Sequence, residues 1–208
     1  FEKLVYGGLT KVFAGIVIAP IGGLIVGVLL TGLIITVFAN RKPAPVNKIF
    51  GRLQIISSAW FALTHGANDG QKTMGIIALI LFSAGMIPEL DIPLWVIFAA
   101  AAAMGLGTFF GGYKVIKTLG VKITRLRPYQ GFAAETGGGL MLAAFAILGI
   151  PASTTHAITG TIMGSGAARR KRAVRWNVSR QIVFSWIITI PGAAGMGIGF
   201  TYLIHLFV

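Results

Sequence analysis

The chain is 208 residues long, 55% of its residues are hydrophobic, and 18 Lys and Arg against 5 Asp and Glu give a net charge of +13. Its mean hydropathy is +0.84, and the apolar residues gather in blocks of about twenty, the length of a membrane-spanning helix. This composition excludes an ordinary soluble domain, and the absence of cysteine excludes disulfides and thiolate-bound metals. We therefore expect a multi-pass integral protein of the cell membrane, with the lipid bilayer as its surroundings.

Taken in chain order, the apolar blocks predict an all-α polytopic membrane bundle, with residues 1–208 forming a single transmembrane domain. Helices are the only open-chain structures that satisfy every backbone hydrogen bond in hydrocarbon. The predicted elements are a helix at 12–38, an interrupted helix at 53–87, a helix at 93–112, a second interrupted segment at 129–167 and a helix at 181–206. The sequence opens without Met, and we expect it to be the interior of a longer chain.

The positions of the cations predict how these elements cross the membrane. Fifteen of the eighteen Lys and Arg lie in three loops, at residues 41–52, 114–127 and 169–180. The positive-inside rule and anionic headgroups explain such loops without nucleic acid, so we expect the loops to be cytoplasmic and no nucleic acid to be bound. Residues 129–167 then cross an even number of times. A re-entrant hairpin meets this condition, and two complete crossings are the alternative.

The segment at 53–87 leads from a basic loop to a short loop with Glu89, Asp91 and no cation, so it crosses once. Its 35 residues at about 1.5 Å each exceed a hydrocarbon core of about 30 Å. The helix must therefore break or tilt, and we expect the break between Gly66 and Gly70.

Polar side chains at residues 64–74 interrupt this apolar segment. Polar groups at bilayer depth are unfavourable and usually line a substrate or ion path. Carboxylate and amide oxygens suit a hard cation, amide and hydroxyl groups can donate to an oxyanion, and Asp69 could instead carry a proton. Lys72 either attracts the anion or pairs with Asp69, and a polar kink packed against another helix is the alternative without a ligand. The candidates are Asn68, Asp69, Gln71 and Thr73 for substrate, and Asn68 and Asp69 for the coupling ion.

A second polar cluster occupies residues 151–160. Pro151 suits a first helical turn, and the hydroxyls of Ser153, Thr154 and Thr155 would lie beside free N–H groups at a helix start. Such a start can hold phosphate or sulfate oxygens without an arginine, because the N–H groups and the helix dipole both favour an anion. The alternative is that the hydroxyls only cap the helix.

Glu135 is the other acid expected within the membrane, at the entry to the segment at 129–167. It is a candidate for the coupling ion, either by holding sodium or by exchanging a proton, and a structural ion pair with a loop cation is the alternative. His65 and His156 have no Cys or paired His at metal-ligand spacing, so we expect packing roles rather than zinc. The sodium-ligand candidates are therefore Asn68, Asp69 and Glu135, and we expect neither a cofactor besides Na⁺ or H⁺ nor a catalytic residue.

The motifs Gly-Ala-Asn-Asp-Gly-Gln-Lys at 66–72 and Pro-Ala-Ser-Thr-Thr-His at 151–156 resemble the inorganic phosphate transporter (PiT) family. The order of the motifs is similar to the second half of that family, and Glu135 falls where the family has a functionally important glutamate. The resemblance covers essentially the whole chain. It implies a secondary carrier built from two inverted repeats, which takes up inorganic phosphate together with Na⁺ or H⁺. The residues that it implies for phosphate contact are Asn68, Gln71, Ser153, Thr154 and Thr155.

The resemblance also implies a partner, since this chain would hold only half of the ligands of such a carrier. The partner is the first half of the same carrier, or else a second copy of the chain in a homodimer. Other functions stay open on the residues alone: a permease for sulfate or another tetrahedral oxyanion, and a phosphate-binding membrane subunit that does not transport. An enzyme using the His65 and Asp69 spacing for general-base chemistry is disfavoured, because the nearby glycines argue against a regular helix there.

Overall fold

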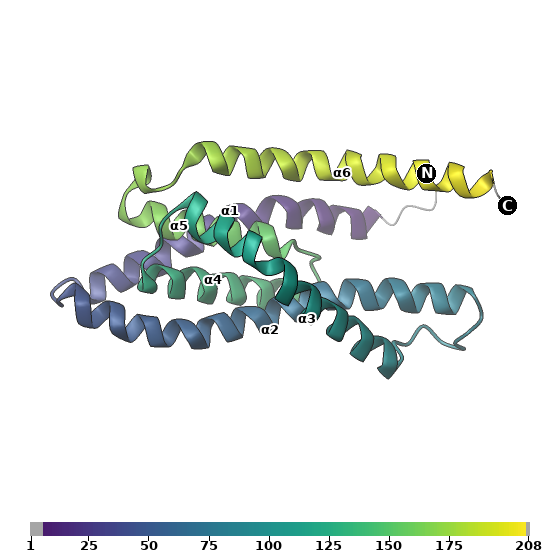
Figure 1. The fold of residues 1–208 in the computed structure, drawn as a ribbon, viewed down its shortest axis with the longest axis horizontal. Coiled ribbons are helices and arrows are strands. Elements are labelled where there is room, and N and C mark those ends of the chain that lie inside the picture. Colours follow the sequence, from purple (N-terminus) through teal and green to yellow (C-terminus); the bar gives the residue numbers. More distant parts are fainter. Residues whose placement is uncertain (1–5, 207–208) are drawn as a thin grey trace. The chain divides into compact units, whose positions relative to one another are not determined.

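The structure is a computed structural model that describes residues 6–206, and the regular elements of this part are all helical (Figure 1). The chain divides into two compact units, Phe1–Val174 and Arg175–Val208. The first unit holds five α-helices and two short helical turns, and the second holds the last α-helix. The elements are α1 (Tyr6–Val37), α2 (Pro43–Ser83), α3 (Leu94–Lys117), the π-helix η1 (Thr118–Ile123), α4 (Pro128–Ile147), α5 (Thr154–Arg169), the 3₁₀ turn η2 (Lys171–Ala173) and α6 (Trp176–His205).

Three of the helices in the described part are long and apolar enough to cross a membrane: α1, residues Leu94–Tyr113 of α3, and α6. They overlap the segments predicted at 12–38, 93–112 and 181–206, with ends that differ by up to six residues. The segment predicted at 129–167 corresponds to the antiparallel pair of α4 and α5. How this hairpin meets the bilayer stays a prediction.

Helix ends in the first unit follow ordinary capping chemistry. Pro43 and Pro128 open α2 and α4 at positions where a backbone N–H has no helical partner. Gly85 and Gly149 lie just beyond the ends of these two helices with φ of 69° and 60°, the left-handed conformation that glycine adopts without steric cost. The short link from Gly149 to Ser153 then returns the chain into α5.

One expectation is wrong: α2 is not broken between Gly66 and Gly70. It is a single α-helix of 41 residues, about 60 Å long at 1.5 Å per residue. An interior glycine costs a helix only about 1 kcal/mol relative to alanine, and no proline follows Pro45 within α2 to remove a backbone donor. Asn68 Nδ2 also donates to the Thr64 carbonyl at 2.9 Å, a local bond that is compatible with the helical ladder.

The closest helix pair in the first unit is α1 with α5. A Cβ atom on Gly23 would lie 2.6 Å from the Ala157 carbonyl oxygen, and Cβ atoms on Gly27 and Gly164 would overlap the carbonyl oxygens of Thr161 and Leu24. The two backbones are therefore in direct contact, as small residues allow in membrane helix pairs. Because higher numbers on α1 face higher numbers on α5, these helices run parallel.

Helix α4 lies between this pair and α2. Gln54 of α2 lies over Gly131 and the Asn68 amide reaches the Leu142 carbonyl, so α2 and α4 also run parallel. Gln130 Nε2 of α4 donates to the Ser165 carbonyl of α5 at 2.7 Å, which fixes the antiparallel hairpin. A buried apolar cluster joins α1, α4 and the start of α5; its members are Ala19, Leu142, Phe145, Ala152 and Ala157.

Candidate functional site

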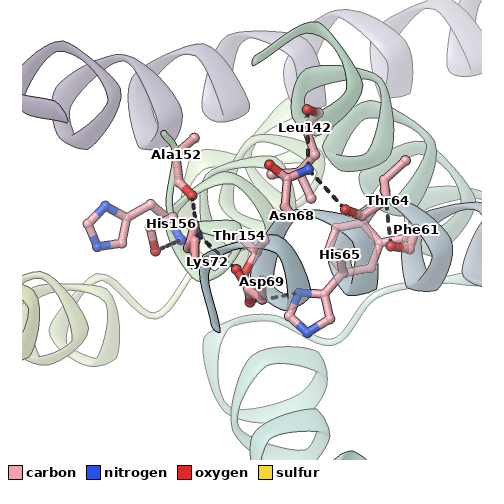
Figure 2. A network of polar contacts seen from close by, with 11 residues as sticks. Phe61, Thr64, His65, Asn68, Asp69, Lys72, Leu142, Ala152, Thr154 and His156 are labelled. Atoms are coloured by element: carbon pink, nitrogen blue, oxygen red, sulfur yellow. Dashed lines mark hydrogen bonds and ion pairs between the residues drawn. The ribbon is translucent and has the colours of Figure 1, made fainter. Parts of the chain in front are cut away.

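Asp69, on α2, is the centre of a polar network that reaches the beginning of α5 (Figure 2). Its Oδ1 accepts a hydrogen bond from Lys72 Nζ at 2.9 Å, and its Oδ2 accepts one from Thr154 Oγ1 at 2.9 Å. The Nδ1 atom of His65 lies 3.4 Å from Oδ2. Both carboxylate oxygens thus have polar partners, and the side chain is only 31% exposed.

Lys72 makes a second connection between α2 and the segment before α5. Its Nζ donates to the backbone carbonyl of Ala152 at 2.9 Å as well as to Asp69. Ala152 is itself buried. Two hydrogen bonds therefore connect α2 to the start of α5: one from the Thr154 hydroxyl to Asp69 and one from the Lys72 ammonium group to Ala152.

The start of α5 lies beside these links. Ser153 is the N-cap residue, and its Oγ accepts from the His156 backbone N–H at 3.4 Å. A cavity of about 300 Å³ opens here. The helix dipole and the first-turn N–H groups make its α5 side favourable for an anion. The cavity is lined by Val12, Ile16, Asp69, Lys72, Pro151, Ala152, Ser153, Thr154 and Thr155.

The structure brings some of the candidate substrate residues together at this cavity. Ser153, Thr154 and Thr155 of the second motif meet Asp69 of the first across 84 to 86 positions of sequence. Thr155 is exposed and Thr154 is buried. The two motifs, which lie far apart in the sequence, thus converge on one cavity.

The other candidates of the first motif do not line the cavity. The amide of Asn68 turns toward α4 and donates to the carbonyls of Thr64 at 2.9 Å and Leu142 at 3.4 Å. Gln71 and Thr73 are exposed on α2 and are absent from the cavity wall. Because the residues follow a regular helix rather than a loop, they point around the axis in different directions instead of toward one centre.

Glu135 belongs to a separate polar cluster between α2 and α4. Its Oε2 accepts from Ser57 Oγ at 2.6 Å, and its Oε1 accepts from Gln54 Nε2 at 3.3 Å. Glu135 is seven residues before Leu142 on α4, about 10 Å along the helix axis. The acid is therefore held by neutral donors and has no ion pair with a loop cation among the described residues.

Sequence reasoning missed Gln54 and Ser57 and left the role of Lys72 open. Gln54 and Ser57 are polar residues three positions apart in an apolar stretch, so they share a helix face; this spacing was a usable signal. The carbonyl of Ala152 carries no sequence signal at all, because every residue has one.

Regular helix also changes the interpretation of His65. It lies one turn before Asp69 on the same face, contrary to the expectation of an irregular backbone there, and its ring stacks on Phe61 with centroids 5.9 Å apart. Within residues 6–206 no three His, Cys, Asp or Glu side chains gather as a metal-binding group. His65 is thus a neighbour of Asp69 that also packs against an aromatic ring.

The known proteins that are similar to this chain match it over most of its length. The model of the phosphate transporter family matches residues 1–197. A protein of Rhizobium meliloti named as a probable low-affinity inorganic phosphate transporter is 48% identical over 93% of this chain and 58% of its own length. A Bacillus subtilis protein of the same name is 39% identical over 95% of this chain and 60% of its own length.

A solved structure is similar as well. The sodium-dependent phosphate transporter is 26% identical, with a TM-score of 0.63, and the match covers 88% of this chain and 56% of that one. The chain thus spans between 56% and 60% of the length of these three proteins.

Proposed function

Because the chain belongs to the phosphate transporter family, we propose that it forms part of a carrier that moves inorganic phosphate across a membrane together with sodium. It is a multi-pass membrane protein, and the proteins similar to it are transporters rather than enzymes. The name of the solved relative supports sodium over a proton as the coupling ion. The observation that carries the proposal is the meeting of Asp69 with Thr154 at a cavity on the N-terminus of α5.

Phosphate is proposed to bind at the start of α5. The hydroxyls of Ser153 and Thr155 and the first-turn N–H groups supply donors on one side of the cavity, and Thr154 joins them when its single hydroxyl proton turns from Asp69. An oxyanion bound there also needs donors on the side of the cavity opposite α5. Gln71 and Thr73 are exposed on α2, so they could donate to a phosphate that lies between this chain and a neighbouring one. Asn68 would have to turn from its two carbonyl acceptors to join them.

The coupling ion is proposed to bind Asp69, with Asn68 beside it and Glu135 as a second site. Oxygen ligands suit a hard cation, and Asp69 already lies beside the hydroxyl of Thr154. A charged Asp69 without a cation partner repels a phosphate dianion, and a bound cation cancels that repulsion. Binding of either ligand then favours the other, which is the thermodynamic requirement for coupling.

The chain is proposed to work as one half of an inverted-repeat carrier. It spans 58% and 60% of the two curated relatives, and its cavity has donors from α5 and α2 but an apolar wall of Val12 and Ile16 from α1. The remaining ligands would come from the other part of the carrier, or from a second copy of this chain in a homodimer. Secondary transporters commonly place their sites between two repeats in this way.

The test is uptake of ³²P-phosphate into proteoliposomes that contain either the 208-residue chain alone or the complete carrier. Uptake driven by an inward sodium gradient in the complete carrier is expected, with little in the chain alone. Uptake driven only by a proton gradient would identify H⁺, rather than sodium, as the coupling ion. Labelled sulfate in parallel vesicles tests the oxyanion alternative, and phosphate binding without flux under any gradient would favour a non-transporting subunit instead.

A further inference from the structure

The ammonium group of Lys72 lies between two oxygen atoms that come from different elements. Nζ is 2.9 Å from Asp69 Oδ1, on α2, and 2.9 Å from the carbonyl oxygen of Ala152, just before α5. Figure 2 shows these two contacts converging on one nitrogen, with Thr154 on the other oxygen of the same carboxylate. The ammonium group thus bridges a charged oxygen and a backbone oxygen.

These oxygens are of the kind that hold sodium in secondary transporters. Carbonyl groups of non-helical backbone beside a half-helix, together with a carboxylate, are typical ligands of such ions. The carbonyl of Ala152 is in non-helical backbone, one residue before the N-cap of α5. An ammonium group and a sodium ion at this position would need the same oxygen atoms, so they compete.

Lys72 is able to leave this position without unfolding its surroundings. Its side chain is 45% exposed and lines the cavity at the start of α5. The lysine stem is flexible and its charge is compact, and an exposed ion pair three residues apart on a helix is held only weakly. The ammonium group can therefore exchange one partner for another within the same cavity.

We infer that Lys72 is a tethered cation that competes with the coupling sodium for Asp69 and the Ala152 carbonyl, and that displacement by sodium releases its charge toward phosphate. This inference rests on the proposed function and deepens it. Before displacement the charges of Asp69 and Lys72 cancel. After sodium neutralises Asp69, the released ammonium adds one positive charge to the cavity where the α5 donors lie, so phosphate binds better after sodium has bound.

The competition has a consequence of opposite sign for the two ligands. Removing the ammonium group removes the competitor of sodium, so sodium should bind more tightly. The same change removes a positive charge that phosphate uses, so phosphate should bind less tightly. A lysine that only stabilised the fold would weaken both ligands together, or neither.

The experiment measures binding of ²²Na⁺ and of ³²P-phosphate to the purified complete carrier in detergent, at constant ionic strength set with choline. For Lys72→Met we expect the half-saturating sodium concentration to fall about tenfold and the half-saturating phosphate concentration to rise about tenfold, within the usual range of coupling between sites. Lys72→Gln, a second neutral variant, should do the same. Lys48→Met is the matched control, because Lys48 is an exposed residue of α2 outside the cavity, and it should bind both ligands as the wild type does.

A second measurement follows the ammonium group itself. Acylation of Lys72 by an amine-reactive probe, quantified by mass spectrometry, should become faster when sodium is added alone and slower again when phosphate follows. Lys48 should not respond. The inference would be wrong if both neutral variants bound sodium with unchanged or weaker affinity, or if sodium did not change the reactivity of Lys72. Either result would leave the proposed phosphate transport intact. A wild-type carrier that binds neither ion would instead overturn the proposed function, and the inference with it.

Discussion

The hydroxyl of Thr154 donates a hydrogen bond of 2.9 Å to Oδ2 of Asp69, joining two residues that are 85 positions apart. The donor comes from the first turn of α5 and the acceptor from the middle of α2. The bond therefore depends on the relative position of these two helices. A change in the charge at Asp69 acts directly on the segment where phosphate is proposed to bind.

Replacing Asp69 by Asn tests the cation site. The amide keeps an oxygen that can accept from Thr154, but the negative charge that attracts a cation is lost. We expect sodium-driven phosphate uptake to fall by about 10- to 100-fold, in line with coupling free energies between sites. The measurement is initial uptake against sodium concentration. Asp91→Asn, in an exposed loop, is the control and should transport normally, whereas normal transport by the Asp69 variant would remove this residue from the site.

Thr154→Val removes the hydroxyl and keeps the shape of the side chain. Hydrogen bonds to charged groups contribute about 1.5–3 kcal/mol, and the partial exposure of Asp69 places the loss near the lower value. We expect the half-saturating sodium concentration for uptake to rise about tenfold, with recovery in Thr154→Ser.

A matched control for that substitution lies on the same helix. Thr159 is fully buried, and its hydroxyl has no hydrogen-bond partner among the described residues. Thr159→Val should leave uptake unchanged and should not lower the thermal stability. If both valine variants have the same kinetics, the bond between Thr154 and Asp69 has no role in transport.

Glu135→Gln tests the second proposed ion position. Ser57 and Gln54 hold the carboxylate from α2, and the neutral variant removes the charge while it retains a carbonyl oxygen to accept from them. We expect the sodium dependence of uptake to shift severalfold toward higher concentration, with a smaller shift in Ser57→Ala. Glu89→Gln, in the exposed loop, should match the wild type. A variant that loses stability but keeps its sodium dependence would identify the cluster as structural.

Gly27→Ala tests the contact between the backbones of α1 and α5. A Cβ atom at Gly27 would overlap the Thr161 carbonyl, whereas one at Gly32, on the same helix, has no atom within 4 Å. Overpacking typically costs about 1–3 kcal/mol, so Gly27→Ala should lower the temperature at which the protein aggregates in detergent. Gly32→Ala should leave that temperature unchanged or raise it. Size-exclusion chromatography after heating provides the measurement.

The elements were more predictable from the sequence than their arrangement. Long apolar blocks predicted helices near the observed places because hydrocarbon admits little else. The pattern failed at residues 66–70, where two glycines and several polar groups favoured a break. The helix continues there because an interior glycine costs only about 1 kcal/mol relative to alanine. The hydrogen bond from the Asn68 amide to the Thr64 carbonyl shows that a polar side chain can find a partner within its own helix without disturbing the backbone hydrogen bonds.

The site was predictable in part. The residue types of the two motifs indicated a cation and an anion, but no periodicity predicts that Asp69 meets Thr154 rather than Thr155, because that choice depends on how α5 packs. The close packing of α1 and α5 sets the position of α5, and it depends on glycines at 23, 27 and 164. The direction taken by Lys72 depends on a backbone carbonyl, which no residue type reveals.

The unbroken course of α2 has a mechanical consequence. A helix of 41 residues is about 60 Å long, and Asp69 lies about 39 Å along its axis from Pro43. The turns that begin at Pro43 carry Lys48 and Arg52. Because the helix has no break between these turns and Asp69, a rotation of its first turns about the helix axis also rotates the carboxylate. A displacement at residues 43–52 would thereby reorient the Asp69 carboxylate relative to Thr154.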